Sequence, residues 1–186
     1  SLMFSLNPSG GVAGSPNALN PIIYVTDSLG NLVTDAYIDI TLSLTPDTGD
    51  SSAELQGTKT VKSSNGIATF NNVWVENAAS GYTLTAESPW TSDSISAPFN
   101  VTAATANALG FLAEPGGGSS GSLLSTQPIV AIQDQFGNAV GSASEVQVTL
   151  LITSGTGSSG AILSGTNSVV TSGVTSTFSD LSIDKV

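Results

Sequence analysis

Two short motifs built around an aspartate contain residue types that could bind a metal. The sequence reads VTDSLGNLV over 25–33 and IQDQFGNAV over 132–140, so Asp-x-x-Gly-Asn occurs twice. Calcium takes about six to eight oxygen ligands, several of them from carboxylates, whereas each motif supplies one carboxylate. Asp, Gly and Asn are also typical of tight turns, because Asp accepts bonds from nearby backbone and Gly-Asn tolerates positive φ. The motif therefore predicts a turn in both places.

A second candidate for a cation site is the loop PDTGDSSAE, residues 46–54, which brings together Asp47, Asp50 and Glu54. The comparable segment later in the chain reads TSGTGSSGA and carries no acid. A site built on these acids would therefore belong to the first half of the chain alone, and the alternative is a solvated loop. We expect neither a metal nor a cofactor.

The groups that most enzymes use are scarce. The 186 residues include neither cysteine nor histidine, which excludes thiol nucleophiles, Ser-His-Asp triads and zinc sites based on Cys or His. Two carboxylates held in a cleft can hydrolyse glycosides, but the 14 acidic residues are scattered singly. We expect that the protein is not an enzyme.

The charge balance limits the partners. The net charge is -11 and Lys and Arg together number three, which argues against nucleic acid, because phosphates are neutralised by clustered basic residues. No apolar run approaches the roughly 20 residues of a membrane span, so no membrane insertion is expected. Low charge with abundant Ser, Thr and Gly is common outside the cell, and we expect an extracellular or cell-surface protein.

Three further residues could make surface contacts. Trp74 alternates with apolar neighbours and is expected to point outward, and Trp90 lies in SPWTS at 88–92, the expected tip of a hairpin. An exposed Trp can bind a sugar or a protein partner; alternatively, each covers a neighbouring domain or the edge of its own. Asn100 begins the sequon Asn-Val-Thr and is the glycosylation candidate if the source is eukaryotic.

The Asp-x-x-Gly-Asn motif recurs because it lies within an internal repeat with an offset of about 107 residues. Residues 108–140 align with 1–33 without a gap, and the match continues after one inserted residue. The paired residues include Leu2 with Leu109, Phe4 with Phe111, Pro8 with Pro115, Pro21 with Pro128, Asp27 with Asp134, Ile40 with Val148, Phe70 with Phe178, and Val75 with Ile183.

The repeat predicts two domains. The first covers 1–102, a short linker covers 103–108, and the second covers 109–186. The second copy contains nothing that matches GYTLTAES (81–88) or ISAPFNVT (95–102). It is therefore expected to lack its last two strands, and the chain is expected to be a slice of a longer array.

Alternating apolar residues separated by turn residues predict an all-β fold. The first copy is expected to contain about seven strands, at 3–6, 22–26, 37–44, 59–62, 67–75, 82–87 and 95–102. Seven short strands in about 100 residues are typical of an immunoglobulin-like sandwich. We therefore expect tandem immunoglobulin-like β-sandwiches, the second of them incomplete.

The motifs resemble those of a known family. PIIYVTDSLGNLV (21–33), GIATFNNVWV (66–75), GYTLTA (81–86) and SAPFNV (96–101) are similar to bacterial Ig-like repeats of large surface and secreted proteins, including invasin and intimin stalks. Similar repeats also occur in extracellular filaments such as mastigonemes. The resemblance implies a non-enzymatic extracellular module.

Three functions follow as expectations. The first is a stalk or spacer of a long surface protein or adhesin, whose partners are neighbouring repeats of the same chain. In this arrangement Phe136, in the turn of the second copy, is expected to contact the first. The alternatives are a filament subunit that binds other copies laterally or by donating a strand, and a carbohydrate-binding module that binds glycans through Trp74 or Trp90.

Overall fold

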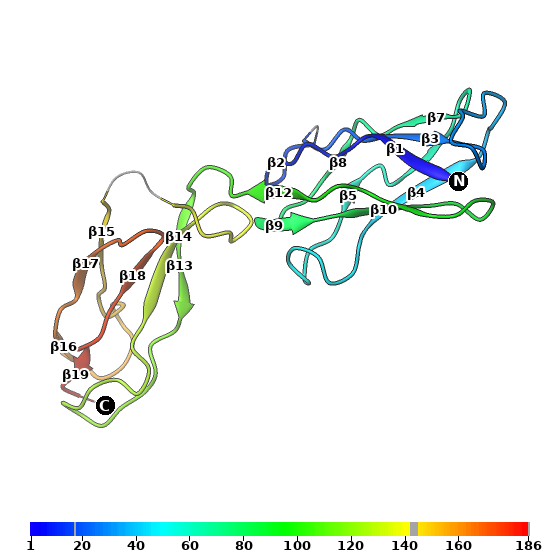
Figure 1. Ribbon diagram of the computed structural model, residues 1–186. Coiled ribbons are helices and arrows are strands. Elements are labelled where there is room, and N and C mark those ends of the chain that lie inside the picture. Colours follow the sequence, from blue (N-terminus) through cyan, green and yellow to red (C-terminus); the bar gives the residue numbers. More distant parts are fainter. Residues whose placement is uncertain (17, 142–144, 186) are drawn as a thin grey trace. The chain divides into compact units, whose positions relative to one another are not determined.

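The computed structural model describes residues 1–16, 18–141 and 145–185. The chain divides into two compact units, unit 1 (Ser1–Ala104) and unit 2 (Thr105–Val186). The division falls within residues 103–108, the linker expected from the sequence. Both units are built from strands (Figure 1), and the described residues contain no helix.

Unit 1 is made of short strands arranged in several small sheets. One sheet has the order β1-β3-β7, a second β11-β10-β4-β6, a third β2-β12-β9, and β5 pairs with β8. The strands are β1 (Leu2–Leu6), β2 (Gly11–Val12), β3 (Ile22–Val25), β4 (Asp39–Leu44), β5 (Gln56–Gly57), β6 (Thr60–Lys62), β7 (Ile67–Thr69), β8 (Val73–Trp74), β9 (Ala79–Tyr82), β10 (Leu84–Glu87), β11 (Ser94–Ile95) and β12 (Phe99–Thr102).

The N-terminal segment of unit 1 pairs with two different sheets. β1 runs antiparallel to β3, while β2 runs parallel to β12, with Gly11 opposite Val101. Parallel neighbours require a long connection, and here β2 and β12 are separated by almost the whole unit. The second and last strands of unit 1 are therefore hydrogen-bonded to each other.

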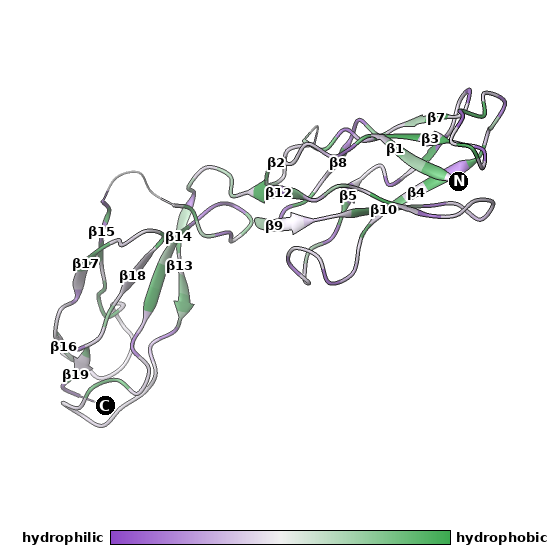
Figure 2. Ribbon diagram, viewed as in Figure 1, coloured by the Kyte–Doolittle hydropathy of each residue, from purple (hydrophilic) through white to green (hydrophobic). Residues whose placement is uncertain are grey.

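The core of unit 1 follows from the period of two in its strands. In β4 the side chains of Ile40 and Leu42 are buried while those of Asp39 and Thr41 are exposed. Ala86 of β10 lies opposite Leu42 and is also buried. Hydrophobic residues gather on the strands and hydrophilic residues in the turns (Figure 2).

Unit 2 contains a smaller set of strands. β13, β14 and β18 form a three-stranded antiparallel sheet, β15 pairs with β17, and β16 pairs with β19. Phe178, Leu181, Val130 and Val148 form its buried core. The strands are β13 (Ala108–Ala113), β14 (Ile129–Gln133), β15 (Gln147–Thr149), β16 (Leu163–Ser164), β17 (Ser168–Val170), β18 (Thr175–Thr177) and β19 (Ser182–Ile183).

The strands of unit 2 occur at the repeat positions read from the sequence. β13 and β14 match β1 and β3, and β15, β17 and β18 match β4, β6 and β7. Residues 118–119, which correspond to β2, are not a strand. β2 exists in unit 1 because β12 pairs with it, and no described residues of unit 2 take the place of β12.

The all-β class is confirmed, but the number and length of the strands differ from the expectation. Several expected strands are interrupted, so the described part of unit 1 has twelve short strands instead of about seven. The expected strand 95–102 breaks where the Ser96 hydroxyl accepts the N–H of Leu84 and where Pro98 has no N–H to donate. The expected strand 82–87 breaks at Thr83, whose N–H bonds to the Thr48 hydroxyl.

Candidate functional site

The Asp-x-x-Gly-Asn motif of unit 1 closes on itself. The Asp27 Oδ1 atom accepts the backbone N–H of Leu29 at 2.8 Å and that of Asn31 at 2.9 Å, and Oδ2 accepts the Asn31 side-chain amide at 3.0 Å. Gly30 has φ +85°, which glycine adopts without strain. The predicted turn is confirmed, and both carboxylate oxygens of Asp27 accept hydrogen bonds from residues of the turn.

The same hydrogen bonds recur in unit 2. Asp134 accepts the N–H groups of Phe136 and Asn138 at 2.9 Å each, and the Asn138 amide donates to Oδ2 at 2.9 Å. Gly137 has φ +86°. The two turns therefore share one geometry, and neither leaves a carboxylate oxygen without a donor.

The electrostatics of Asp27 agree with this geometry. Hydrogen bonds from Asn31, first from its side chain and then from its backbone, hold the pKa of the Asp27 carboxyl below its usual value. The carboxylate is therefore the form that the turn prefers. Its negative charge is stabilised by hydrogen-bond donors of its own loop.

The acidic loop of unit 1 does not assemble a metal site. Asp50 accepts the backbone N–H and the hydroxyl of Ser52 at 2.8 Å each, and its other oxygen accepts the Asn77 amide at 3.1 Å. These bonds lower the pKa of Asp50. The described residues contain no group of three or more acidic side chains positioned to hold a metal. The structure therefore does not bring Asp47, Asp50 and Glu54 together as ligands.

The two tryptophans have different surroundings. Trp74 is half-buried in β8, and its indole N–H donates to Glu76 Oε1 at 3.4 Å. Trp90 lies in the connection between β10 and β11 and is 80% exposed. Residues that flank Trp90 in the sequence, Glu87, Ser88, Pro89 and Asp93, line an open hollow of about 510 Å³ together with Thr41, and Trp90 itself is not part of that lining. Trp90 is therefore exposed, and a contact through it stays a prediction, whereas the Trp74 ring packs against Gly57 of its own unit.

Asn100 and Phe136 are both described. Asn100 is exposed on β12, and its side-chain oxygen accepts the N–H of Gly81 at 2.9 Å. Phe136 is half-buried in the second turn. A contact of Phe136 with the first domain, and a glycan on Asn100, stay predictions.

The sequence analysis missed the residue that organises the acidic loop. Tyr82 is fully buried, and its hydroxyl donates to the backbone oxygen of Asn77 at 3.0 Å. Burial raises the pKa of this phenol. A Cβ on Gly49, whose φ is +62°, would lie 2.1 Å from the Tyr82 ring. The sequence feature that could have indicated this packing is Gly49 in Asp-Thr-Gly-Asp, because only a residue without a Cβ leaves room for the Tyr82 ring.

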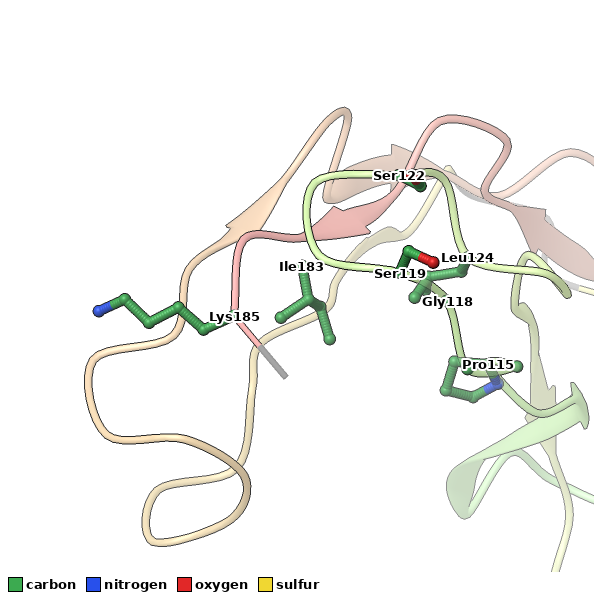
Figure 3. A pocket seen from close by; sticks show the side chains of 9 residues that line it. Pro115, Gly118, Ser119, Ser122, Leu124, Ile183 and Lys185 are labelled. Atoms are coloured by element: carbon green, nitrogen blue, oxygen red, sulfur yellow. The ribbon is translucent and has the colours of Figure 1, made fainter.

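Unit 2 contains a hollow of about 280 Å³ (Figure 3). Backbone of the glycine-rich segment 115–119 lines it together with Leu124 and Ile183. Lys185 extends away from these side chains, and its ammonium donates to the Gly160 oxygen at 3.0 Å. The lining thus combines apolar side chains with backbone groups, the serines Ser119 and Ser122, and Lys185.

Comparison with known proteins assigns no identity. No family model, curated protein or solved structure matches the chain. In the described part of the chain, no helix has the length and hydropathy to cross a bilayer. The internal repeat and the geometry of the two units are therefore the basis for a functional assignment.

Proposed function

We propose that the chain is a non-enzymatic structural module, a pair of immunoglobulin-like repeats that act as a spacer in a long extracellular or cell-surface protein. The observation that carries the proposal is the recurrence of the self-contained Asp-x-x-Gly-Asn turn. Asp27 and Asp134 make the same three side-chain hydrogen bonds in units of matching strand positions. Residues repeated for their turn geometry, and not for a ligand, suit a structural role.

Two features of unit 1 support the immunoglobulin-like assignment. The N-terminal segment divides its pairing, because β1 joins β3 in one sheet and β2 runs parallel to β12 in another. Tyr82 donates its hydroxyl to the backbone of Asn77, five residues upstream, which resembles the tyrosine corner of immunoglobulin-like sandwiches. Tyr82 also stacks on Phe99 with ring centroids 5.7 Å apart.

The proposed mechanism is mechanical. Each unit forms its Asp-x-x-Gly-Asn turn from its own residues, and the number of such repeats in the parent protein sets its reach. Few basic residues and the net negative charge disfavour self-association. Neighbouring repeats of the same chain are the partners of such a module.

Single-molecule stretching of the chain between two marker domains tests this function. A spacer needs units that resist extension up to a defined force and then unfold in one step. Unit 1 spans Ser1–Ala104, so at about 3.4 Å per extended residue its unfolded chain measures roughly 350 Å, and unfolding should add that length less the end-to-end distance of the folded unit. A chain that extends smoothly, without a discrete step of that size, contradicts the proposal.

A second candidate function is glycan binding, which the exposure of Trp90 favours. Its indole is 80% exposed, and the neighbouring hollow offers carboxylates from Glu87 and Asp93 that can accept bonds from sugar hydroxyls. A glycan array probed with the chain and with its Trp90→Ala variant separates the two functions. Saturable binding that the substitution abolishes supports the glycan-binding function.

A further inference from the structure

One tight turn of unit 1 contains a chemically labile pair of residues. Residues 64–67 read Ser-Asn-Gly-Ile, and Asn65-Gly66 is the only Asn-Gly pair in the sequence. In such a pair the backbone nitrogen of glycine can attack the side-chain carbonyl carbon of asparagine, because glycine has no Cβ to hinder the approach and permits the rotation that ring closure needs. Asn65 is exposed, whereas Gly66 is buried. The pair thus combines an accessible amide with a nitrogen that the fold shields from solvent.

The pair occupies the two central positions of a type I′ turn. The φ angle is +52° at Asn65 and +76° at Gly66, and this turn requires positive φ at both positions. The Ser64 N–H donates to the Ile67 oxygen at 2.8 Å, and the Ile67 N–H donates to the Ser64 oxygen at 3.0 Å. The turn connects β6, which pairs with β4, to β7, which pairs with β3. It therefore joins two different sheets of unit 1.

The backbone of Gly66 is bonded on both of its sides. Its N–H donates to the Ala36 oxygen at 3.1 Å, and its carbonyl oxygen accepts the N–H of Val25 at 2.8 Å. A Cβ on Gly66 would lie 2.3 Å from the Val33 oxygen, so the glycine packs directly against the neighbouring backbone. The nitrogen that would attack Asn65 is therefore engaged as a donor while the turn is closed.

Ser63 strengthens this attachment. Its side chain is fully buried, and its hydroxyl donates to the same Ala36 oxygen at 3.0 Å and accepts the N–H of Ile38 at 3.0 Å. The Ser63 N–H in turn donates to the Ile38 oxygen at 2.9 Å. The turn is therefore anchored, through Ala36 and Ile38, to the segment that precedes β4.

Unit 2 forms the same turn without an asparagine. Gly173 occupies the repeat position of Asn65 and has φ +67°. Ser172 and Thr175 bond to each other in both directions, at 2.8 Å and 3.4 Å. The turn therefore needs a residue that adopts positive φ at this position, but it does not need an amide. Asn65 brings a reactive group that the fold itself does not require.

We propose that Asn65 is a deamidation site that the closed turn protects and that opening of the turn activates. In the open turn the Gly66 nitrogen loses its proton to a solvent base and attacks Asn65 Cγ. The Cγ–Nδ2 bond breaks, ammonia leaves and a succinimide ring forms. Water then adds to one of the two imide carbonyls, and the ring opens to aspartate or to isoaspartate. The reaction uses only water and needs no oxidant.

The isoaspartate product should prevent the turn from closing again. Its backbone runs through the former side-chain carbonyl and is longer by one methylene, so the bonds between Ser64 and Ile67 cannot both re-form at their present spacing. A single opening that leads to isoaspartate is thus irreversible for unit 1. This modification is a property of unit 1 alone and goes beyond the role as a spacer, so either proposal can fail without the other.

Comparison of the folded and the unfolded chain tests the protection. The 186-residue chain is incubated at one mildly alkaline pH in buffer and in urea, and is then digested with trypsin and Glu-C. Tandem mass spectrometry of the peptide 63–76 distinguishes Asn65 from Asn71 and Asn72. Because only the open turn reacts, Asn65 should deamidate at least about tenfold more slowly in buffer than in urea. Equal rates, or an Asn65 that stays intact in urea, would overturn the proposal.

Two variants separate opening of the turn from unfolding of the whole unit. Ser63→Ala removes the hydroxyl that bonds the Ala36 oxygen and should speed deamidation of Asn65 in buffer about fivefold or more, because loss of one hydrogen bond shifts the opening equilibrium by that factor. Tyr82→Phe is the matched control, since it removes one hydrogen bond outside the turn, to Asn77, and should leave this rate unchanged. Tryptophan fluorescence verifies that unit 1 is folded in both variants. Equal acceleration by both would show that the reaction follows global unfolding, which contradicts a local opening.

Refolding tests the effect of the product on the fold. The chain is incubated in urea, the urea is removed, and the recovery of unit 1 is measured by tryptophan fluorescence. The unaltered chain should lose recovery in proportion to its isoaspartate at position 65. After the same incubation Asn65→Gly, which has the residue type of unit 2 at this position, should recover fully. Asn65→Asp should also refold when freshly prepared, because it adds the charge without lengthening the backbone. Full recovery of chains that carry isoaspartate would refute the proposed effect on the turn.

Discussion

The pair Gly49 and Gly157 allows the effect of one buried ring on stability to be isolated. Both glycines have nearly the same positive φ, +62° and +66°, so alanine should introduce about 1–2 kcal/mol of backbone strain at either position. At Gly49 the new Cβ would also lie 2.1 Å from the Tyr82 ring, while at Gly157 it would meet nothing within 4 Å. Since Tyr82 is fully buried, its ring can yield only by disturbing the core, which costs about 1–3 kcal/mol more.

The chain provides a selective assay for this prediction. Trp74 and Trp90 both lie in unit 1, and unit 2 contains no tryptophan, so tryptophan fluorescence reports the unfolding of unit 1. Gly49→Ala should lower the fluorescence melting temperature by at least about 8 °C, because the two losses total about 2–5 kcal/mol and each kcal/mol shifts the midpoint by about 4–8 °C in a domain of this size. Gly157→Ala should leave that transition unchanged and lower only the transition of unit 2 in far-UV circular dichroism.

The additional loss of stability expected for Gly49→Ala, compared with Gly157→Ala, should disappear when the Tyr82 ring is removed. In a Tyr82→Leu background, Gly49→Ala should produce only the strain that Gly157→Ala produces, because the smaller side chain leaves room for the Cβ. Equal losses for the two alanine substitutions in the unaltered chain would refute the reasoning. That result would mean that the Tyr82 ring does not press on the loop in solution.

Three further predictions concern single side chains. The lowered pKa of Asp27 stabilises unit 1 above the usual carboxyl pKa, and this stabilisation is lost as pH falls through the lowered pKa. In Asp27→Asn the free energy of unfolding should therefore be lower at neutral pH and should change less as pH falls. Tyr82→Phe should lose about 1 kcal/mol in urea unfolding, because the Asn77 oxygen loses its donor, and stability should no longer decline as pH rises through the raised phenol pKa. Phe178→Ala should destabilise unit 2 by about 3–5 kcal/mol in circular dichroism without moving the fluorescence transition.

The local features of this fold could be predicted from the sequence. The Asp27 turn was predictable because Asp, Gly and Asn supply its hydrogen bonds and positive φ from within five residues. The inward side of β4 followed from the alternation of Ile40 and Leu42 with polar neighbours. Neither inference required knowledge of a distant segment.

The features that escaped prediction depend on pairing between distant segments. β2 is a strand only because β12 lies beside it, and the break at Thr83 exists because Thr48 takes its N–H. The packing of Tyr82 on Gly49 joins residues from a strand and from a loop far upstream. Single-sequence patterns do not record such contacts. The acids of 46–54 appeared clustered in the sequence, but Asp50 bonds to Ser52 and Asn77.

The parallel pairing of β2 with β12 also determines how unit 1 carries a load. A force that pulls the unit from its two chain ends draws β2 by its N-terminal side and β12 by its C-terminal side. Because the strands run in the same direction, the force acts along them, and the bonds between them, including that from the Ala13 N–H to the Thr102 oxygen, must break together instead of one after another. A few hydrogen bonds loaded in shear can thus resist the unfolding of the whole unit, while the same bonds pulled apart from one end would break one after another.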